Sequence, residues 1–455
     1  TAASRREPSR AAPVCANATP SACEGSVHPN SIQTRGASLR RGCASGYTAA
    51  PMHERELTAY LDECRALVLD EIRAIVARQH AGGPNDGFLY DLMLDYPLRD
   101  AKGLRPALCV ATCRALGGKL EAVVRSAAVL ELYHNAFLIH DDIEDESLVR
   151  RGRPTLHREH GVPIAVNVGD AMLALSLQPL LDNVETIGLG PALRTLRAVA
   201  RMTRESVEGQ AIELDWVRRG SLDDADAQAL DELGDADYVR MVEGKTCWYS
   251  FITPIEVGAI AAGASTAILD ELREFARVLG VAFQIQDDLL NLAGEIGSYG
   301  KEIGGDLWEG KRTLILLHCM RCANPAERAE IRVILAKPHP AALERPSELE
   351  GLLTALVERG ELSGSGRDAI LERLGQVGQG GQLGTASRGC KTEADVQRLF
   401  ALIHEQGSLD YARAFARAGL LDARARLAAC QRFMPASVHR EFLTSLVDYV
   451  FARER

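Results

Sequence analysis

The sequence predicts an all-α protein, and three observations lead to this fold class. Hydrophobic residues make up 46% of the 455 residues but aromatic residues only 5%, and Ala, Leu and Arg abound, which favours helices over sheets. From Met52 onwards, apolar residues recur at the spacing of a helix face. We find no convincing strand alternation, and one helical core can reach about 300 residues.

Successive amphipathic patterns, separated by short breaks, define the expected helices. The first is a long helix over residues 54–78, and the Gly- and Pro-containing stretch 82–87 is expected to be a loop. The later patterns predict helices over residues 104–116, 120–140, 163–181, 193–213, 236–248, 255–262 and 269–292.

Residues 1–51 differ in composition from the rest of the chain. They are rich in Ala, Ser, Arg and Pro and have almost no apolar periodicity, so we expect a disordered N-terminal extension. Met52 is the first Met and stands where helical periodicity begins, which favours an extension upstream of the natural start. An organellar transit peptide or a tether to a partner is the alternative.

Residues 339–389 form a second unusual region within an expected domain of residues 52–455. Ser347 with Glu350 three residues later marks a helix start. Residues 367–374 form another short helical pattern, and a Gly-rich stretch over 375–389 follows. We expect a surface insertion of one or two helices with a flexible return.

The bulk composition excludes several classes of protein. The net charge of −10 argues against nucleic-acid binding. No apolar run is expected to reach the length of a membrane span. The eleven Cys residues lack the spacing of a disulfide framework, which is typical of a reduced, cytoplasmic protein.

The first of two acidic patches interrupts an otherwise apolar helical stretch. It contains Asp141, Asp142 and Asp145, and it is followed by Arg150 and Arg151. Residues four apart share a helix face, so Asp141 and Asp145 point the same way. A solvated helix face would explain this patch alone equally well.

The second acidic patch lies about 145 residues later. It contains Asp287, Asp288 and Asn291, and it is followed by Lys301 and Lys311. Uncompensated carboxylates beside apolar residues are costly, so a solvated face explains the pair of patches poorly. Two such faces set opposite each other would form an oxygen-rich cage for Mg²⁺ shared with substrate phosphates, and the basic side chains would hold the remaining phosphate oxygens.

The chain resembles the trans-isoprenyl diphosphate synthases, also called the polyprenyl synthetase family. The resemblance covers roughly residues 55–335 and resumes near Lys391. Five motifs in family order carry it: Lys102-Gly103-Leu104-Arg105-Pro106, Tyr133-His134-Asn135, the first patch with Arg150-Arg151-Gly152, Gly244-Lys245-Thr246, and the second patch with its Lys-containing continuation to Thr313. It implies an isoprenoid synthase helical bundle with a deep central cavity, forming a homodimer.

The resemblance also implies a reaction, the head-to-tail condensation of isopentenyl diphosphate with an allylic diphosphate. The allylic diphosphate ionises, the double bond of isopentenyl diphosphate attacks the resulting cation, and the departing diphosphate is the expected base. Mg²⁺ is the implied cofactor, because it stabilises the leaving oxygens. A short-chain product, C15 to C20, is expected.

The resemblance assigns roles to individual residues. The implied metal ligands are Asp141, Asp145 and Asp287, with Asp142 and Asp288 holding metal-bound water. The allylic diphosphate would be held by Arg150, Lys245 and Lys301. Isopentenyl diphosphate would be held by Lys102, Arg105, His134 and Arg151. Thr246 and Gln284 would face the reacting carbons, and the loop with Asp306 and Lys311 would close over the site.

Product length is expected to depend on the helix that carries the first patch. In this family the residues four, five and eight before the motif commonly form the floor of the pocket, and here they are Phe137, Ala136 and Tyr133. One small residue between two aromatic ones favours a geranylgeranyl over a farnesyl product.

Two other functions remain open. Much of the family has Asp at position 291, and the run from Asp287 through Asn291 to Glu295 also resembles the metal motif of class I terpene cyclases. A cyclase would not need the residues Lys102, Arg105 and His134. The other alternative is a non-catalytic regulatory subunit of a prenyl synthase, which would be expected to lose the charged site residues that this chain keeps.

Overall fold

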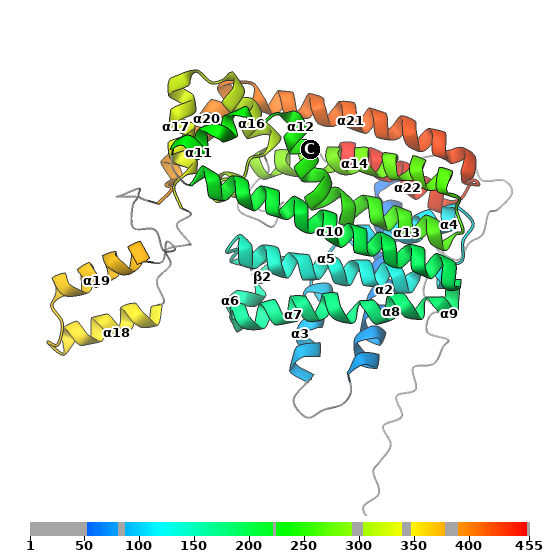
Figure 1. Ribbon diagram of the computed structural model, residues 1–455, viewed down its shortest axis with the longest axis horizontal. Coiled ribbons are helices and arrows are strands. Elements are labelled where there is room, and N and C mark those ends of the chain that lie inside the picture. Colours follow the sequence, from blue (N-terminus) through cyan, green and yellow to red (C-terminus); the bar gives the residue numbers. More distant parts are fainter. Residues whose placement is uncertain are drawn as a thin grey trace, which may run out of the picture. The chain divides into compact units, whose positions relative to one another are not determined.

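The computed structural model describes residues 52–80, 87–221, 224–293, 304–338, 347–377 and 390–452. Over these residues the chain is almost entirely helical (Figure 1), which confirms the predicted all-α class. The expectations for residues 1–51, for Lys301 and for Glu295 lie outside the described residues.

The first half of the described chain contains helices joined by short connections. They are α2 (Glu54–Gln79), α3 (Gly87–Leu98), α4 (Leu104–Ala115), η1 (Leu120–Ala122), α5 (Val124–Glu144), α6 (Leu156–His160), α7 (Val162–Leu175), α8 (Leu177–Asp182), α9 (Val184–Ile187), α10 (Leu189–Gly220), α11 (Asp224–Ala229) and η2 (Leu230–Glu232).

The second half continues in the same way. Its elements are α12 (Asp235–Val242), η3 (Glu243–Ile252), α13 (Thr253–Ala261), α14 (Thr266–Ala293), α15 (Gly305–Glu309), α16 (Leu314–Cys322), α17 (Pro325–Leu335), α18 (Ser347–Glu358), α19 (Gly364–Val377), α20 (Glu393–Glu405), α21 (Ser408–Cys430), η5 (Gln431–Phe433) and α22 (Val438–Ala452). Each helix expected from periodicity corresponds to helical elements here, although the expected helices 120–140, 163–181 and 236–248 are each divided between two of them.

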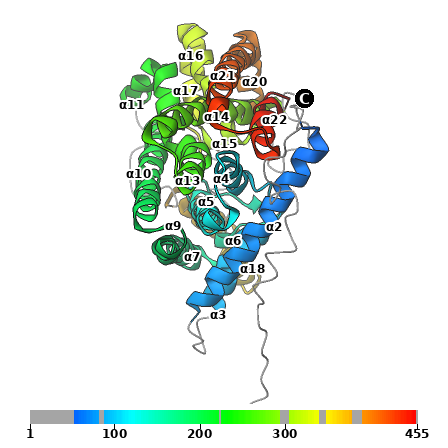
Figure 2. The ribbon, with the colours of Figure 1, turned by 90° about the vertical axis from the view of Figure 1, so that its right-hand side faces the viewer.

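Two long helices carry the acidic patches into the interior. α5 packs against α2, α4 and α7, and Figure 2 shows it nearly end-on among them. α14 packs against α21 and η3. Most of α5 is buried, and apolar side chains of α2, α4, α5, α13 and α14 form one continuous core. The acidic patches therefore stand at the edge of a packed apolar interior.

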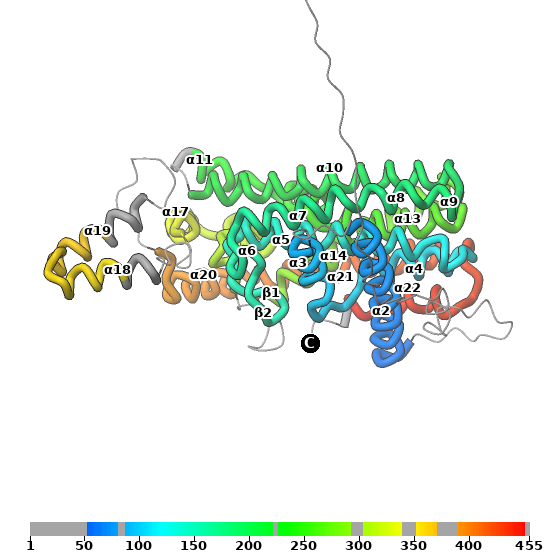
Figure 3. Tube along the Cα trace, turned by 90° about the horizontal axis from the view of Figure 1, so that it is seen from below, coloured from blue at the N-terminus to red at the C-terminus, as the bar shows by residue number. Residues whose placement is uncertain are grey.

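A small β-hairpin departs from the expectation that the chain has no strands. β1 (Val149–Arg150) pairs with antiparallel β2 (Arg153–Pro154) just before α6 (Figure 3). The two turn residues, Arg151 and Gly152, both have positive φ, at 52° and 73°, as a tight type I′ turn requires. Strands of two residues are too short to show alternation in the sequence.

The segment Val162–Ile187, which spans α7 to α9, differs from the expectation that no apolar run reaches the length of a membrane span. It is long and apolar enough to cross a membrane by length and composition, with a mean hydropathy of 1.4 in its most apolar window. Of that window, 39% is buried inside the protein. A core helix of a globular domain passes the same test, so this observation is weak evidence for a membrane span.

The ends of the expected insertion are tied together. The backbone N–H of Lys391 donates to the carbonyl of Pro338 at 3.0 Å, and Lys337 Nζ lies 2.6 Å from an oxygen of Asp395. Between these ends, α18 begins at Ser347 as expected and packs against α19. The chain therefore leaves and re-enters the domain at one point, as a surface insertion requires.

Candidate active site

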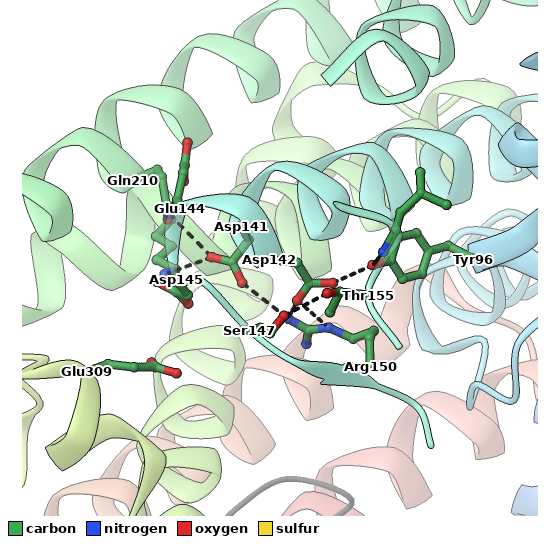
Figure 4. Close-up of polar contacts among 12 residues, drawn as sticks. Tyr96, Asp141, Asp142, Glu144, Asp145, Ser147, Arg150, Thr155, Gln210 and Glu309 are labelled. Carbon is green, nitrogen blue, oxygen red and sulfur yellow. Dashed lines mark hydrogen bonds and ion pairs between the residues drawn. The ribbon is translucent and has the colours of Figure 1, made fainter. Parts of the chain in front are cut away.

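The first acidic patch stands at the C-terminal end of α5, where side chains from other elements contact it, among them Gln210 and Arg150 (Figure 4). Asp141 Oδ1 lies 3.4 Å from Lys245 Nζ and accepts a hydrogen bond from Gln210 at 3.3 Å. Asp145 Oδ2 accepts from Lys311 Nζ at 2.8 Å. The two aspartates expected to share a helix face thus each meet a lysine from a distant part of the chain.

Lys245 reaches the first patch because α10 and η3 approach each other very closely. A Cβ atom at Gly209 would lie 2.1 Å from the backbone nitrogen of Lys245, so only glycine fits there. One turn further along α10, Glu213 forms an ion pair with Lys245. Burial acts to lower the pKa of Lys245, but Glu213 and then Asp141 outweigh it and raise the pKa above its usual value. The lysine is therefore a fixed positive charge.

η3 itself is π-helical over ten residues. Such segments are rare and occur mostly at functional sites. The π-helical segment contains both Lys245 and Thr246. Thr246 Oγ1 donates to Gln284 Oε1 at 2.9 Å, so the two residues expected to face the reacting carbons are hydrogen-bonded to each other.

Asp142 does not share the setting of Asp141 and Asp145. Its side chain is fully buried, and Tyr96 donates its hydroxyl proton to Oδ2 at 2.6 Å. Arg150 Nε donates to Oδ1 at 2.8 Å (Figure 4). Arg150 also reaches the first patch, because its Nη2 lies 3.6 Å from Asp141 Oδ2. Asp142 and Arg150 are thus paired with each other in this structure, and their expected roles as holder of metal-bound water and as phosphate ligand stay predictions.

The second acidic patch repeats this pattern on α14. Asp288 is buried, and it accepts hydrogen bonds from the Tyr238 hydroxyl at 2.6 Å and from Gln284 Nε2 at 2.8 Å. Burial raises the pKa of Asp288 well above its ordinary range. Asp288 is thus held by two side chains of the protein, and its expected role as holder of metal-bound water stays a prediction. Its neighbour Asp287 is half-buried.

Asn291 connects the second patch to α15, so part of the segment expected to be a loop around Asp306 and Lys311 is a short helix. Its side-chain oxygen accepts from the backbone N–H of Asp306 at 3.3 Å. The backbone N–H of Lys311 in turn donates to the carbonyl of Asp306 at 2.9 Å. α15 is thus tied to α14 through Asp306, and Lys311, just after α15, lies between Asp145 and Glu309.

The residues expected to hold isopentenyl diphosphate line a common pocket. A cavity of about 160 Å³ is bordered by Lys102, Arg105, His134 and Arg151, together with Phe283 of α14 and the C-terminal helix α22. Gly103, at the start of α4, has a positive φ of 62°, which lets the chain turn between the two basic residues. Four residues from three separate motifs therefore converge.

Each basic group of this pocket is held in place by a neighbour. Arg105 donates to Ser250 at 2.7 Å and lies over the ring of Tyr249. Lys102 Nζ lies 3.2 Å from the Tyr449 hydroxyl. The Arg151 guanidinium donates to the carbonyl of Tyr96 at 3.0 Å. The pocket thus presents three positive charges to an anion.

His134 contributes no charge to the pocket. Burial, and then the nearby Arg105 and Arg151, lower the pKa of His134 well below its ordinary value. Its ring stacks on Tyr249, and its Nδ1 is buried without a hydrogen-bond partner. A neutral imidazole can orient a ligand by one hydrogen bond, and it does not repel the adjacent arginines.

The three expected floor residues lie on α5, before the first acidic patch, and none of their side chains is fully exposed. Tyr133 and Ala136 are buried and Phe137 is half-buried. The ring centroids of Tyr133 and Phe137 are 6.1 Å apart, and Phe137 is 5.6 Å from Tyr249. Tyr249 also stacks on His134, so the expected floor adjoins the basic pocket.

The donor chemistry of the acidic patches suits a hard cation, but a ready-made cage is not present. Among the residues that the structure describes, no three His, Cys, Asp or Glu side chains are gathered as a metal site. Lys245 and Lys311 instead neutralise Asp141, Asp145 and Glu213. The carboxylate oxygens fit Mg²⁺ by type, and the two lysines would have to release them.

Several residues of the site were missed from the sequence. The largest group is the set of partners that surround the motifs: Tyr96, Gln210, Glu213, Tyr238, Glu309 and Tyr449. Gln210 and Glu213 are three residues apart on an amphipathic helix, which is a detectable signal for a shared face. The tyrosines carry no such signal.

Comparison with known proteins places the chain in context. The model of the polyprenyl synthetase family matches residues 88–348, more than half of the chain. A geranylgeranyl diphosphate synthase of Methanosarcina mazei is 33% identical over 48% of the chain and 63% of its own length. An octaprenyl diphosphate synthase of Haemophilus influenzae is 35% identical over 51% of the chain and 64% of its own length. The chain thus spans less than two thirds of either relative.

A solved structure is similar over a longer stretch. The polyprenyl synthase of Caulobacter crescentus CB15, complexed with calcium and isoprenyl diphosphate, superposes with a TM-score of 0.63 at 25% identity. The match covers 90% of this chain and 100% of that one. The helical architecture is therefore shared across most of the chain.

Proposed function

The chain belongs to the polyprenyl synthetase family, a family of prenyltransferases, and we propose that it condenses isopentenyl diphosphate with an allylic diphosphate. The observation that carries the proposal is the presence of two adjoining anion sites. Phe283 lines the basic pocket, and the next residue, Gln284, bonds to Thr246 beside Lys245. Two diphosphates can thus be held with their carbon chains meeting between them.

Each site has a separate task in this proposal. Lys102, Arg105 and Arg151 bind the diphosphate of isopentenyl diphosphate by charge-assisted hydrogen bonds. Lys245 and Lys311 bind the allylic diphosphate beside the first acidic patch. The Thr246 and Gln284 oxygens stand next to Lys245, where they stabilise positive charge as the allylic carbon ionises.

We propose Mg²⁺ as the cofactor, held by Asp141 and Asp145 from α5 and by Asp287 from α14. When bound, the metal supplies Lewis-acid stabilisation to the leaving diphosphate oxygens. Support comes from the carboxylate donor set and from the Caulobacter synthase, which was solved with calcium and isoprenyl diphosphate. The lysines that now neutralise Asp141 and Asp145 would turn to the phosphate oxygens.

The setting of Asn291 favours a synthase over a terpene cyclase. Its side-chain oxygen accepts a hydrogen bond from the backbone N–H of Asp306, which gives Asn291 a role in holding α15 against α14 that needs no metal. The basic pocket around Arg105 and Arg151 also has no purpose in a cyclase. A silent regulatory subunit would not need both anion sites.

We propose a C15 to C20 product, with geranylgeranyl diphosphate favoured. The aromatic pair Tyr133 and Phe137 on α5 supports a closed floor. The Methanosarcina relative is named for a geranylgeranyl product and the Haemophilus relative for an octaprenyl product. Relatives of similar identity thus carry names for different product lengths, and we propose that the floor residues set the length in this chain.

We further propose that the active form is a homodimer in the cytoplasm. Support comes from an apolar surface on successive helices α7 to α10, where large side chains are exposed: Val162, Val166, Leu177, Leu181, Val184, Leu189 and Leu193. A second copy of the chain would cover this surface. Sedimentation of the purified protein tests this, and a monomer at micromolar concentration would contradict it.

Product analysis by mass spectrometry tests the function. The protein is incubated with isopentenyl diphosphate and each of the three short allylic primers, and in parallel with each primer alone. Elongation only when isopentenyl diphosphate is present is the expected result. A cyclic hydrocarbon released from a primer alone would establish the cyclase, and no product in either case would favour the regulatory subunit. Lys102→Ala should raise KM for isopentenyl diphosphate more than for the primer.

A further inference from the structure

Both acidic patches are built in the same way around a buried tyrosine. Tyr96 of α3 donates to Asp142, and Tyr238 of α12 donates to Asp288, each at 2.6 Å. Both tyrosines are 1% exposed or less. In each patch the tyrosine donates a hydrogen bond to the second of two adjacent aspartates, Asp142 or Asp288. The first aspartate of the pair, Asp141 or Asp287, is one of the proposed metal ligands.

Helix geometry explains why this matters for the first aspartate. Adjacent residues of a helix point about 100° apart, so anchoring the second aspartate fixes the rotation of the helix end and thereby the direction of the first. Around Asp142 the anchoring is complete, because Tyr96 and Arg150 satisfy both carboxylate oxygens. Asp141 and Asp145 are then directed at Lys245 and Lys311.

Tyr96 makes further contacts that link the two anion sites. Its hydroxyl accepts a hydrogen bond from the backbone N–H of Leu156 at 3.2 Å. Its carbonyl accepts from Arg151, which lines the basic pocket, at 3.0 Å. The guanidinium of Arg99 lies 4.4 Å above its ring and donates to the carbonyl of Arg150 at 3.0 Å. Tyr96 thus contacts α5 through its hydroxyl and the β1–β2 hairpin through its backbone carbonyl.

The second patch has a simpler version of this arrangement. Tyr238 and Gln284 bind the two oxygens of Asp288, and Gln284 also accepts from Thr246. The tyrosine hydroxyl therefore anchors one end of a chain of hydrogen bonds that reaches η3. The two patches come from distant segments of the chain, and a different buried tyrosine binds the second aspartate of each.

We propose that Tyr96 and Tyr238 are positioning residues that orient the first and second acidic patches toward divalent metal and the allylic diphosphate. The inference rests on the proposed condensation. It assigns no contact with substrate to either tyrosine: each acts through the aspartate that it binds. The hydroxyl is the active group, and the tyrosine ring and backbone serve packing.

Tyr96→Phe and Tyr238→Phe test this, because each removes one hydroxyl and keeps the ring. Tyr60→Phe is the matched control: Tyr60 is 2% exposed and its hydroxyl lies 2.9 Å from His439 Nδ1, away from both patches. A hydrogen bond to a charged group contributes about tenfold to hundredfold to an equilibrium. The Mg²⁺ concentration for half-maximal activity should therefore rise about tenfold or more in the two site variants.

The expected pattern separates positioning from general loss of structure. In Tyr96→Phe the carbonyl that binds Arg151 is unchanged, so KM for isopentenyl diphosphate should stay within about twofold of the parent. Tyr60→Phe should lower thermal stability without shifting the Mg²⁺ dependence. Calorimetric titration of each protein with Mg²⁺ and geranyl S-thiolodiphosphate, which ionises poorly, gives the same comparison without turnover.

Two different failures can be told apart. If the parent protein elongates primers but both site variants keep its Mg²⁺ dependence and analogue affinity, the positioning role is wrong. If the parent elongates no primer, the proposed function is wrong, while the calorimetric comparison still decides whether the tyrosines orient a metal-dependent diphosphate site. A shift in Tyr60→Phe equal to that of the site variants would also overturn the proposal.

Discussion

Replacing Gly209 by alanine should separate α10 from η3 and disable the active site. The new Cβ atom would lie 2.1 Å from the backbone nitrogen of Lys245 and 2.4 Å from the carbonyl carbon of Gly244. Non-bonded heavy atoms settle about 3.5–4.0 Å apart. Both contacts are backbone atoms, so no side chain can rotate away and the two helices must move apart by about 1.5 Å.

The size of the effect follows from two opposing contributions. Overpacking of this kind costs about 1–3 kcal/mol, whereas a Gly→Ala change within a helix by itself stabilises by up to about 1 kcal/mol. We expect a net loss of about 1–2 kcal/mol in the free energy of unfolding. Movement of Lys245 away from Glu213 and Asp141 should lower turnover by about tenfold to hundredfold.

Urea denaturation and steady-state turnover measure the two effects. Gly190→Ala is the matched control, because Gly190 lies on the same helix and a Cβ there would meet nothing within 4 Å. It should leave turnover unchanged and stability equal or slightly higher. If Gly209→Ala behaves like Gly190→Ala in both assays, the close approach of α10 and η3 does not position Lys245.

Four further outcomes are expected. Asp141→Ala and Asp287→Ala should each lower turnover by about a hundredfold or more while the circular dichroism spectrum stays unchanged. EDTA should abolish activity until Mg²⁺ is added. Parent-like activity in both variants would exclude the metal assignment. Burial, and then Arg312, lower the pKa of Lys391 to about 7, whereas the pKa of an unfolded lysine is about 10.4. Between these pH values only the unfolded chain holds the proton, so the free energy of unfolding should rise with pH by up to about 1.4 kcal/mol per unit. Lys391→Met should lack that rise, and equal slopes of both proteins in urea titrations would contradict the prediction. A short linker in place of residues 339–389 should leave a folded, active enzyme, because Pro338 and Lys391 are already hydrogen-bonded to each other. If the shortened protein no longer unfolds cooperatively in urea, the insertion packs on the domain. Phe137→Ala or Tyr133→Ala should lengthen the product and Ala136→Phe should shorten it, and three unchanged product spectra would show that the pocket does not follow α5.

The fold could be predicted from sequence because helices leave a local signature. The pattern over residues 269–292 identifies α14 without knowledge of its neighbours. The hairpin at Arg151 and Gly152 has no such signature, because two-residue strands are defined by their turn. The break of the apolar segment after Val162 into α7, α8 and α9 was likewise not visible in the composition.

The convergence of the site was predictable, whereas its pairings were not. The family resemblance grouped Lys102, Arg105 and Arg151, and the structure places all three in the lining of one pocket. Glu213 was not predicted as a site residue, because an acidic residue on an amphipathic helix is usually exposed to solvent. Its pairing with Lys245 depends on the approach of α10 and η3 at Gly209, which is a property of two segments packed together.

Asp142 shows most clearly what a motif leaves undetermined. Its position beside Asp141 suggested a shared role at the metal, yet a helix turns about 100° between adjacent residues. Two neighbouring aspartates therefore point in different directions and need not share one role. The Asp142 side chain points into the buried interior, where an unpaired carboxylate would be very costly. Tyr96 and Arg150 remove that cost, so the second aspartate of the motif stabilises the helix end while the first is left to bind.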